Sequence, residues 1–108
     1  MKKQLSLVAF LYAHPGKEEE LGGRLRALVD ISRAEPGCTN YDVHQSDEDP
    51  TVFVMYENWT DRSELDKHFE MPYMQEMVAA LPELLRAPLG MHYLTMLSTP
   101  ARSGAPLK

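Results

Sequence analysis

The chain has 108 residues, of which 44% are hydrophobic and 25% are charged, and its formal net charge is −5. This length fits one domain, and the acidic balance argues against a surface that binds nucleic acid. No apolar run approaches the roughly 20 residues of a transmembrane helix, so we expect no membrane partner. Cys38 is the single cysteine, so an intramolecular disulfide is impossible, which fits a reducing, cytoplasmic location.

The N-terminal segment has two interpretations. Lys2 and Lys3 precede an apolar run over residues 5–13, as in a short signal peptide. The run is short, however, no small-residue cleavage site follows it, and His14-Pro15-Gly16 is typical of a turn. We therefore expect a first strand over Leu5–Tyr12.

Residues 17–33 are predicted to form a helix. Apolar or small residues recur there at helical spacing: Leu21, Leu25, Leu28 and Ser32. Glutamates come first and arginines later, which is the order that a helix dipole favours. Gly22 and Gly23 each cost about 1 kcal/mol relative to alanine inside a helix. They are either a tolerated weakness or the mark of a close approach to the sheet or to a ligand.

A hairpin and a second helical region follow. Glu35-Pro36-Gly37 ends the first helix, and strands over 38–45 and 51–59 are joined by a polar loop. Asp61 and Glu64 have the spacing of a capping box at the start of the next helix. Pro72 breaks that helix or starts a new one, and the apolar stripe continues to Pro82.

The last strand is predicted over residues 91–97, after a short turn over 83–86. The order β-α-β-β-α-β predicts an α+β, ferredoxin-like fold with an antiparallel sheet over residues 1–98. Residues 99–108 lack periodicity and are predicted to form a flexible C-terminal tail.

The strand over residues 51–59 alternates between two largely apolar faces. Phe53, Met55, Glu57 and Trp59 share one face, and Val52, Val54, Tyr56 and Asn58 share the other. A strand that is apolar on both sides needs a cover on both sides. In a chain this small, we expect helices on one side and a second copy of the sheet on the other, which predicts a homodimer.

Glu57 and His68 are polar groups in apolar surroundings. His68 shares one helical face with Leu65 and Phe69. Because a buried charge is costly unless it is paired, we expect Glu57 and His68 to be partners. The pair is either a structural tie between helix and sheet, or a catalytic pair in which Glu57 orients His68 as an acid, base or electrostatic stabiliser. Trp59 is either core or the wall of a pocket for a planar ligand.

Other residue types give weaker indications. Five tyrosines are candidates for lining the same cavity: Tyr12, Tyr41, Tyr56, Tyr73 and Tyr93. Five methionines are either adaptable core or part of a ligand site: Met71, Met74, Met77, Met91 and Met96. The four histidines lack metal-ligand spacing, so we expect no metal site.

Four short motifs, in their order and spacing, resemble the antibiotic biosynthesis monooxygenase family. They are Glu35-Pro36-Gly37-Cys38, Val54-Met55-Tyr56-Glu57-Asn58-Trp59, Leu65-Asp66-Lys67-His68-Phe69 and Met71-Pro72-Tyr73-Met74. The resemblance runs from about Leu5 to Leu97. It implies a ferredoxin-like protomer that dimerises sheet to sheet into an α+β barrel. It also implies an enzyme that oxidises a quinol or polycyclic phenol with O2, without metal or flavin cofactor.

The resemblance also implies roles for individual residues. His68, Trp59 and Glu57 match the family's recurrent positions and are the predicted catalytic residues, and Asn58 resembles a pocket residue of some members. We expect Tyr56, Tyr73 and Phe69 to contact the substrate as well.

The same residues bear on other functions within and outside the family. Haem-degrading relatives carry an iron-ligating histidine near the position of Val78 and an asparagine on the first strand, and this chain has neither. A branch that handles a small phosphorylated sugar would need polar and basic pocket residues, which are sparse here. Two alternatives stay open: a binding or stress-response module that holds a small hydrophobic molecule without turnover, and an isomerase of a small carbonyl compound.

Overall fold

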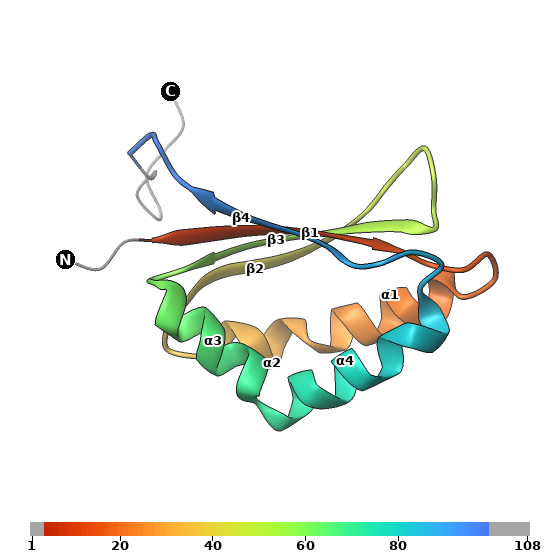
Figure 1. Ribbon diagram of the computed structural model, residues 1–108, viewed down its shortest axis with the longest axis horizontal. Helices are drawn as coiled ribbons and strands as arrows, with labels where there is room; N and C mark the ends of the chain where they lie inside the picture. Colours follow the sequence, from red (N-terminus) through yellow and green to blue (C-terminus); the bar gives the residue numbers. More distant parts are fainter. Residues whose placement is uncertain (1–3, 100–108) are drawn as a thin grey trace.

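The computed structural model describes residues 4–99, which form one antiparallel sheet with all the helices on one of its faces (Figure 1). The strands are β1 (Leu5–Tyr12), β2 (Cys38–Gln45), β3 (Val52–Trp59) and β4 (Gly90–Thr95), in the spatial order β2-β3-β1-β4. The helices are α1 (Glu18–Ala27), α2 (Val29–Arg33), α3 (Arg62–Glu70) and α4 (Pro72–Leu84). This arrangement confirms the predicted ferredoxin-like α+β fold. The predicted tail lies, from residue 100 on, outside the described residues.

The helices differ in detail from the prediction. The single helix expected over residues 17–33 is interrupted at Leu28, whose N–H bonds to the Leu25 carbonyl three residues back, at 3.1 Å, in a tighter turn. Pro72 starts a new helix, at a position where its missing N–H costs nothing. Helix α4 then continues through Pro82 to Leu84, because Pro82 removes only one backbone bond near the helix end.

The start of α3 packs tightly against the loop that leads into β2. Asp61 caps the helix, its Oδ1 accepting the N–H of Glu64 at 3.1 Å, as predicted. The Thr60 N–H donates to the Gly37 carbonyl at 2.9 Å. A Cβ atom on Gly37 would lie 2.3 Å from the Cβ of Glu64, so this approach requires glycine. This contact holds residues 35–37 beside α3.

The core lies between the sheet and the helices. Leu7, Ala9 and Leu11 of β1 are buried there, and they pair across the sheet with Glu57, Met55 and Phe53 of β3. Gly22 brings α1 close to the sheet, since a Cβ atom there would lie 3.1 Å from the Phe53 ring. A Cβ atom on Gly23 would have no neighbour within 4 Å, so only the first of the two glycines marks a close approach.

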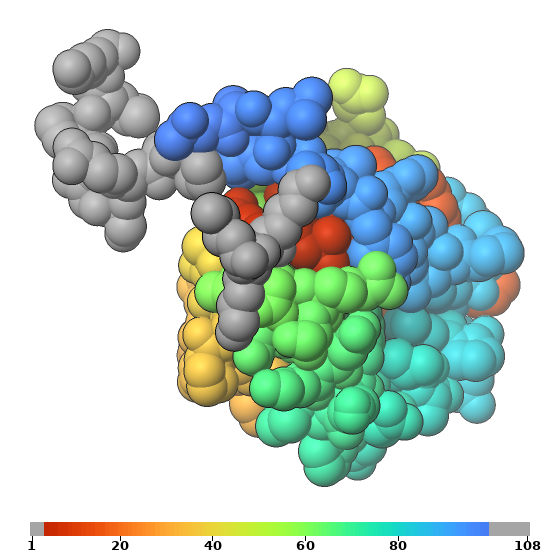
Figure 2. Space-filling view, turned by 60° about the vertical axis from the view of Figure 1, so that its left-hand side comes forward, coloured from red at the N-terminus to blue at the C-terminus, as the bar shows by residue number. Residues whose placement is uncertain are grey.

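The opposite face of the sheet carries no helix (Figure 1). Its apolar side chains remain partly or largely exposed within the described residues: Val8, Phe10, Val54, Tyr56 and Leu94. Strand β4 lies at the edge of the sheet, and Figure 2 shows it (blue) above the surface of α3 (green). Among residues 4–99, no helix is long and apolar enough to cross a membrane.

Candidate functional site

A small cavity lies under the middle of the sheet. Apolar side chains of β1, β3, α1 and α4 form most of its wall, and Tyr41 and Glu57 are the residues in it that carry polar side-chain atoms able to ionise. Its volume is about 50 Å³, enough for a few water molecules but far below the roughly 300 Å³ at which ligand pockets begin. In this conformation the cavity is therefore too small for a polycyclic substrate.

Glu57 is the carboxyl group in the wall of this cavity. It is only 4% exposed, and Trp59 donates its indole Nε1–H to Oε1 at 3.0 Å. Burial raises the pKa of Glu57 to about 7, because a charged carboxylate is poorly solvated there. The Trp59 hydrogen bond lowers this pKa and the nearby charge of Glu35 raises it, but burial dominates. At neutral pH, Glu57 is thus poised both to accept and to donate a proton.

His68 has a different partner from the one predicted. Its Nδ1 lies 2.8 Å from Oε2 of Glu35, and the Tyr73 hydroxyl donates to the same oxygen. The predicted Glu57–His68 pair is therefore wrong. The reason is the tight contact at Gly37, which brings the end of the α2–β2 loop under α3 and places Glu35 beside the ring.

The environment of His68 determines its charge and tautomer. The side chain is fully buried, and burial lowers the pKa of His68 more strongly than the Glu35 carboxylate raises it. In the neutral ring, the contact with Glu35 assigns the proton to Nδ1 and leaves a lone pair on Nε2. Among the described residues, Nε2 has no hydrogen-bond partner.

Trp59 lies between the carboxyl group of Glu57 and the His68–Glu35 pair. Its side chain is completely buried, its ring centroid lies 4.7 Å from that of His68, and its N–H bonds to Glu57. Trp59 and His68 are not part of the cavity wall, whereas Phe69, which contacts the His68 ring, is. Of the three predicted catalytic residues, the structure therefore places Glu57 at the cavity and the other two behind it.

The other predicted substrate contacts are divided between three places. Phe69 lines the cavity, and Tyr73 lines an outer groove between the helices. Tyr56 and Asn58 lie on the opposite face of the sheet, where Asn58 bonds to Asn40 at 2.8 Å and to Ser6. Strand alternation makes this separation unavoidable, because residues 56 and 58 must point away from residues 57 and 59.

Sequence reasoning missed two residues of this region. The sequence indicates Glu35 as part of a helix stop and of a family motif, but not as the carboxylate that binds His68. Tyr41 was one of five undifferentiated tyrosines, yet it is 2% exposed and lines the cavity with Glu57. Burial and the charge of Glu57 raise the pKa of Tyr41, so its hydroxyl keeps its proton.

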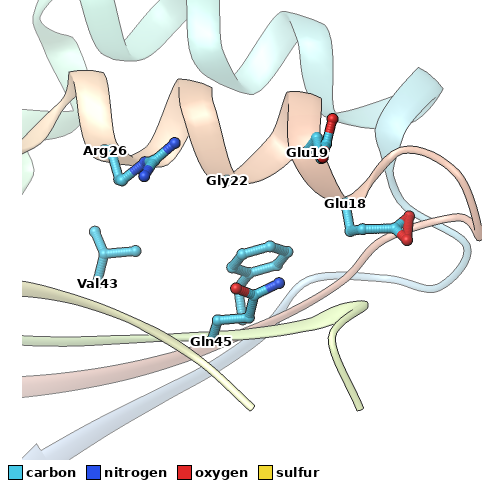
Figure 3. Close-up of a pocket in the computed structure, with 7 residues that line it drawn as sticks. Glu18, Glu19, Gly22, Arg26, Val43 and Gln45 are labelled. Carbon is cyan, nitrogen blue, oxygen red and sulfur yellow. The ribbon is translucent and has the colours of Figure 1, made fainter. Parts of the chain in front are cut away.

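A wider groove lies elsewhere, between α1 and the ends of β2 and β3 (Figure 3). Its volume is about 470 Å³, and Glu18, Glu19 and Arg26 of α1 face Val43 and Gln45 of β2 across it. None of the predicted site residues lines this groove. Within residues 4–99, no group of three or more His, Cys, Asp or Glu side chains is arranged to hold a metal ion.

Known proteins are similar to this chain in both sequence and fold. The chain is 39% identical over 83 residues to "Putative monooxygenase YcnE" of Bacillus subtilis, which covers 77% of this chain and 87% of that protein. It is 36% identical over 74 residues, or 68% of this chain, to the uncharacterized protein sll1783 of Synechocystis, and this match spans half the length of that protein.

Among solved structures, PA3566 of Pseudomonas aeruginosa superposes with a TM-score of 0.85 at 37% identity, covering 91% of this chain and 98% of that one. The family model for antibiotic biosynthesis monooxygenases matches residues 5–80, the segment that holds Glu35, Glu57, Trp59 and His68. The fold and these matches lead to one conclusion: the chain belongs to the antibiotic biosynthesis monooxygenase family.

Proposed function

We propose that the protein is a monooxygenase that oxidises a quinol or other electron-rich hydroxyaromatic compound with O2, without a bound cofactor. The observation that carries this proposal is Glu57, a carboxyl group with a pKa of about 7 in the wall of an apolar cavity. Such a group accepts a phenolic proton at neutral pH, and the apolar wall keeps water from the anion that forms. Membership of the family supports the monooxygenase class.

The chemistry balances with the substrate as the reductant. Glu57 accepts a proton, from the hydroxyl group of a quinol or from the ring CH2 of an anthrone, and the electron-rich anion that forms reacts with O2. For an anthrone-type substrate, the CH2 becomes C=O and one oxygen atom enters the product. The other oxygen atom leaves as water with the two hydrogens of that carbon, one of which Glu57 returns. Tyr41 contributes a neutral hydroxyl in the same wall, and the Trp59 N–H holds Glu57 in place.

Oxygen uptake with a panel of quinols and anthrones tests this proposal. We expect turnover by metal-free protein, and a loss of about 10²–10⁴-fold in kcat for Glu57→Gln, the range for removal of a general base. His68→Ala and Trp59→Ala should lower kcat through the position of Glu57. Absence of turnover with every compound in metal-free protein would refute the proposal.

The small cavity favours a second candidate, an isomerase of a small carbonyl compound. A volume of about 50 Å³ suits a much smaller molecule than an anthrone. Glu57 would then remove a proton next to the carbonyl group and return it to a neighbouring carbon. Turnover without oxygen uptake would identify this activity, and a tightly bound hydrophobic ligand without any turnover would indicate a binding module instead.

We also propose that the open face of the sheet is the interface of a homodimer. Val8, Phe10 and Val54 form part of an apolar surface there that no helix of the described chain covers. In sedimentation experiments at micromolar concentration, we expect a dimer that Val54→Lys dissociates and that Glu19→Lys, on the exposed surface of α1, does not. A monomeric wild-type protein would contradict this proposal.

A further inference from the structure

A second hollow lies directly outside the cavity, between the α1–α2 junction and α4. Its volume is about 280 Å³, and its wall includes Leu28, Ile31, Tyr73 and Met77. Leu28 and Met77 also line the inner cavity, so these two side chains belong to both walls. They are 7% and 5% exposed, and they separate a space open to solvent from one that reaches Glu57.

Both side chains of this partition are able to move at low cost. Met77 is unbranched and has three rotatable side-chain bonds, so it changes rotamer more readily than a branched residue. Leu28 lies where the helix is interrupted between α1 and α2, and its N–H bonds to the Leu25 carbonyl three residues back instead of four. The inner and outer volumes, about 50 and about 280 Å³, together reach the lower end of the range for ligand pockets.

We propose that Leu28 and Met77 form a gate through which the hydroxyaromatic substrate enters, and that the bound substrate occupies both volumes. Its reacting ring lies in the inner cavity beside Glu57. The remainder extends into the outer groove, where Arg24, Tyr73 and Glu76 provide a polar rim suited to hydroxyl or carbonyl groups. Met77 is then a residue that sets the size of substrate the enzyme accepts. The nature of the ligand rests on the proposed function; the gate itself does not.

The neighbouring residue on α4 offers a competing entrance. Val78 also lines the inner cavity and is 48% exposed, so a ligand entering on that side would pass Val78 and avoid Met77. These two adjacent residues therefore provide a matched pair of variants. Met77→Ala removes the partition proposed as the gate, and Val78→Ala enlarges the competing route by a similar kind of truncation.

Stopped-flow fluorescence with 2-naphthol, under anaerobic conditions, measures entry directly. We expect Met77→Ala and Leu28→Ala to raise the association rate constant roughly ten-fold, because a conformational step limits entry in the wild type. Val78→Ala should change it less than about two-fold. Met77→Leu, close in volume but stiffer, should slow association while circular dichroism shows an unchanged fold.

Two results would overturn the gate. One is an association rate constant that increases in Val78→Ala but stays unchanged in Met77→Ala. The other is the absence of saturable 2-naphthol binding in every folded variant, including Met77→Leu. Failure of the proposed function has a different signature. In that case, the association rates would still depend on Met77, while quinols would cause no oxygen uptake. Conversely, oxygen uptake that depends on Glu57, together with association rates insensitive to Met77, would refute the gate alone.

Discussion

Replacement of Glu57 by glutamine should remove a pH dependence of stability that its buried carboxyl group creates. Its pKa rises from 4.5, the ordinary value, to about 7 in the folded protein. A group whose pKa is raised by folding contributes stability that is fully present below about pH 4.5 and is lost as the pH rises through about 7. At 1.36 kcal/mol for each unit, the wild type should lose on the order of 3 kcal/mol between pH 4.5 and 8. Glu57→Gln keeps the shape and the Trp59 contact but cannot ionise, so it should escape this loss.

Urea unfolding of both proteins across pH 4.5–8 measures the effect. The free energy of unfolding of Glu57→Gln, minus that of the wild type, should increase by about 3 kcal/mol from the acid to the alkaline end. His68 acts in the opposite direction, because burial lowers its pKa and its contribution is lost as the pH falls. Its effect is common to both proteins and cancels in the difference. A difference that does not change with pH would show that Glu57 titrates normally and would remove the basis for its role as a base.

Three further substitutions test the packing and hydrogen bonding around the site. Gly23→Ala should stabilise the protein by about 0.5–1 kcal/mol, because alanine favours the helix and its Cβ atom would meet no neighbour within 4 Å. Gly22→Ala should gain less stability or lose some, because the Phe53 ring must move. Equal gains of the two variants in urea unfolding would contradict the close approach at Gly22. Trp59→Phe removes the N–H that lowers the pKa of Glu57, so NMR titration of ¹³C-labelled glutamate carboxyl groups should show that pKa rising above its wild-type value. An unchanged or lower pKa would mean that the indole does not stabilise the carboxylate.

Local sequence patterns were sufficient to predict those elements whose limits are set by hydrophobic alternation, turn residues or a nearby cap. The strands over Leu5–Tyr12 and Cys38–Gln45 begin and end where alternation and turn residues predict them. The Asp61 cap also follows from local sequence, because its partner is only three residues away. The extent of α4 did not, since the helix continues through Pro82 to Leu84, where the proline removes only one backbone bond near the helix end.

The candidate site shows the same difference between what local sequence predicts and what it does not. Strand alternation alone put Glu57 and Trp59 on one face and Tyr56 and Asn58 on the other, as the structure has them. It did not say which of the two largely apolar faces the helices cover. The sequence also identified His68 as an unusual polar group on an apolar helical face. It did not identify Glu35 as the partner of His68, because these residues are 33 positions apart and meet only through the close contact at Gly37.

The sequence by itself therefore determined which side chains share a face, since periods of 2 and 3.6 residues divide each strand and helix into faces. Only the tertiary structure decided which buried polar groups are partners, because hydrogen bonds depend on the distance between elements that sequence patterns do not encode. It assigned Trp59 to Glu57 and Glu35 to His68, and it placed Glu57 alone among the three predicted catalytic residues in the cavity wall.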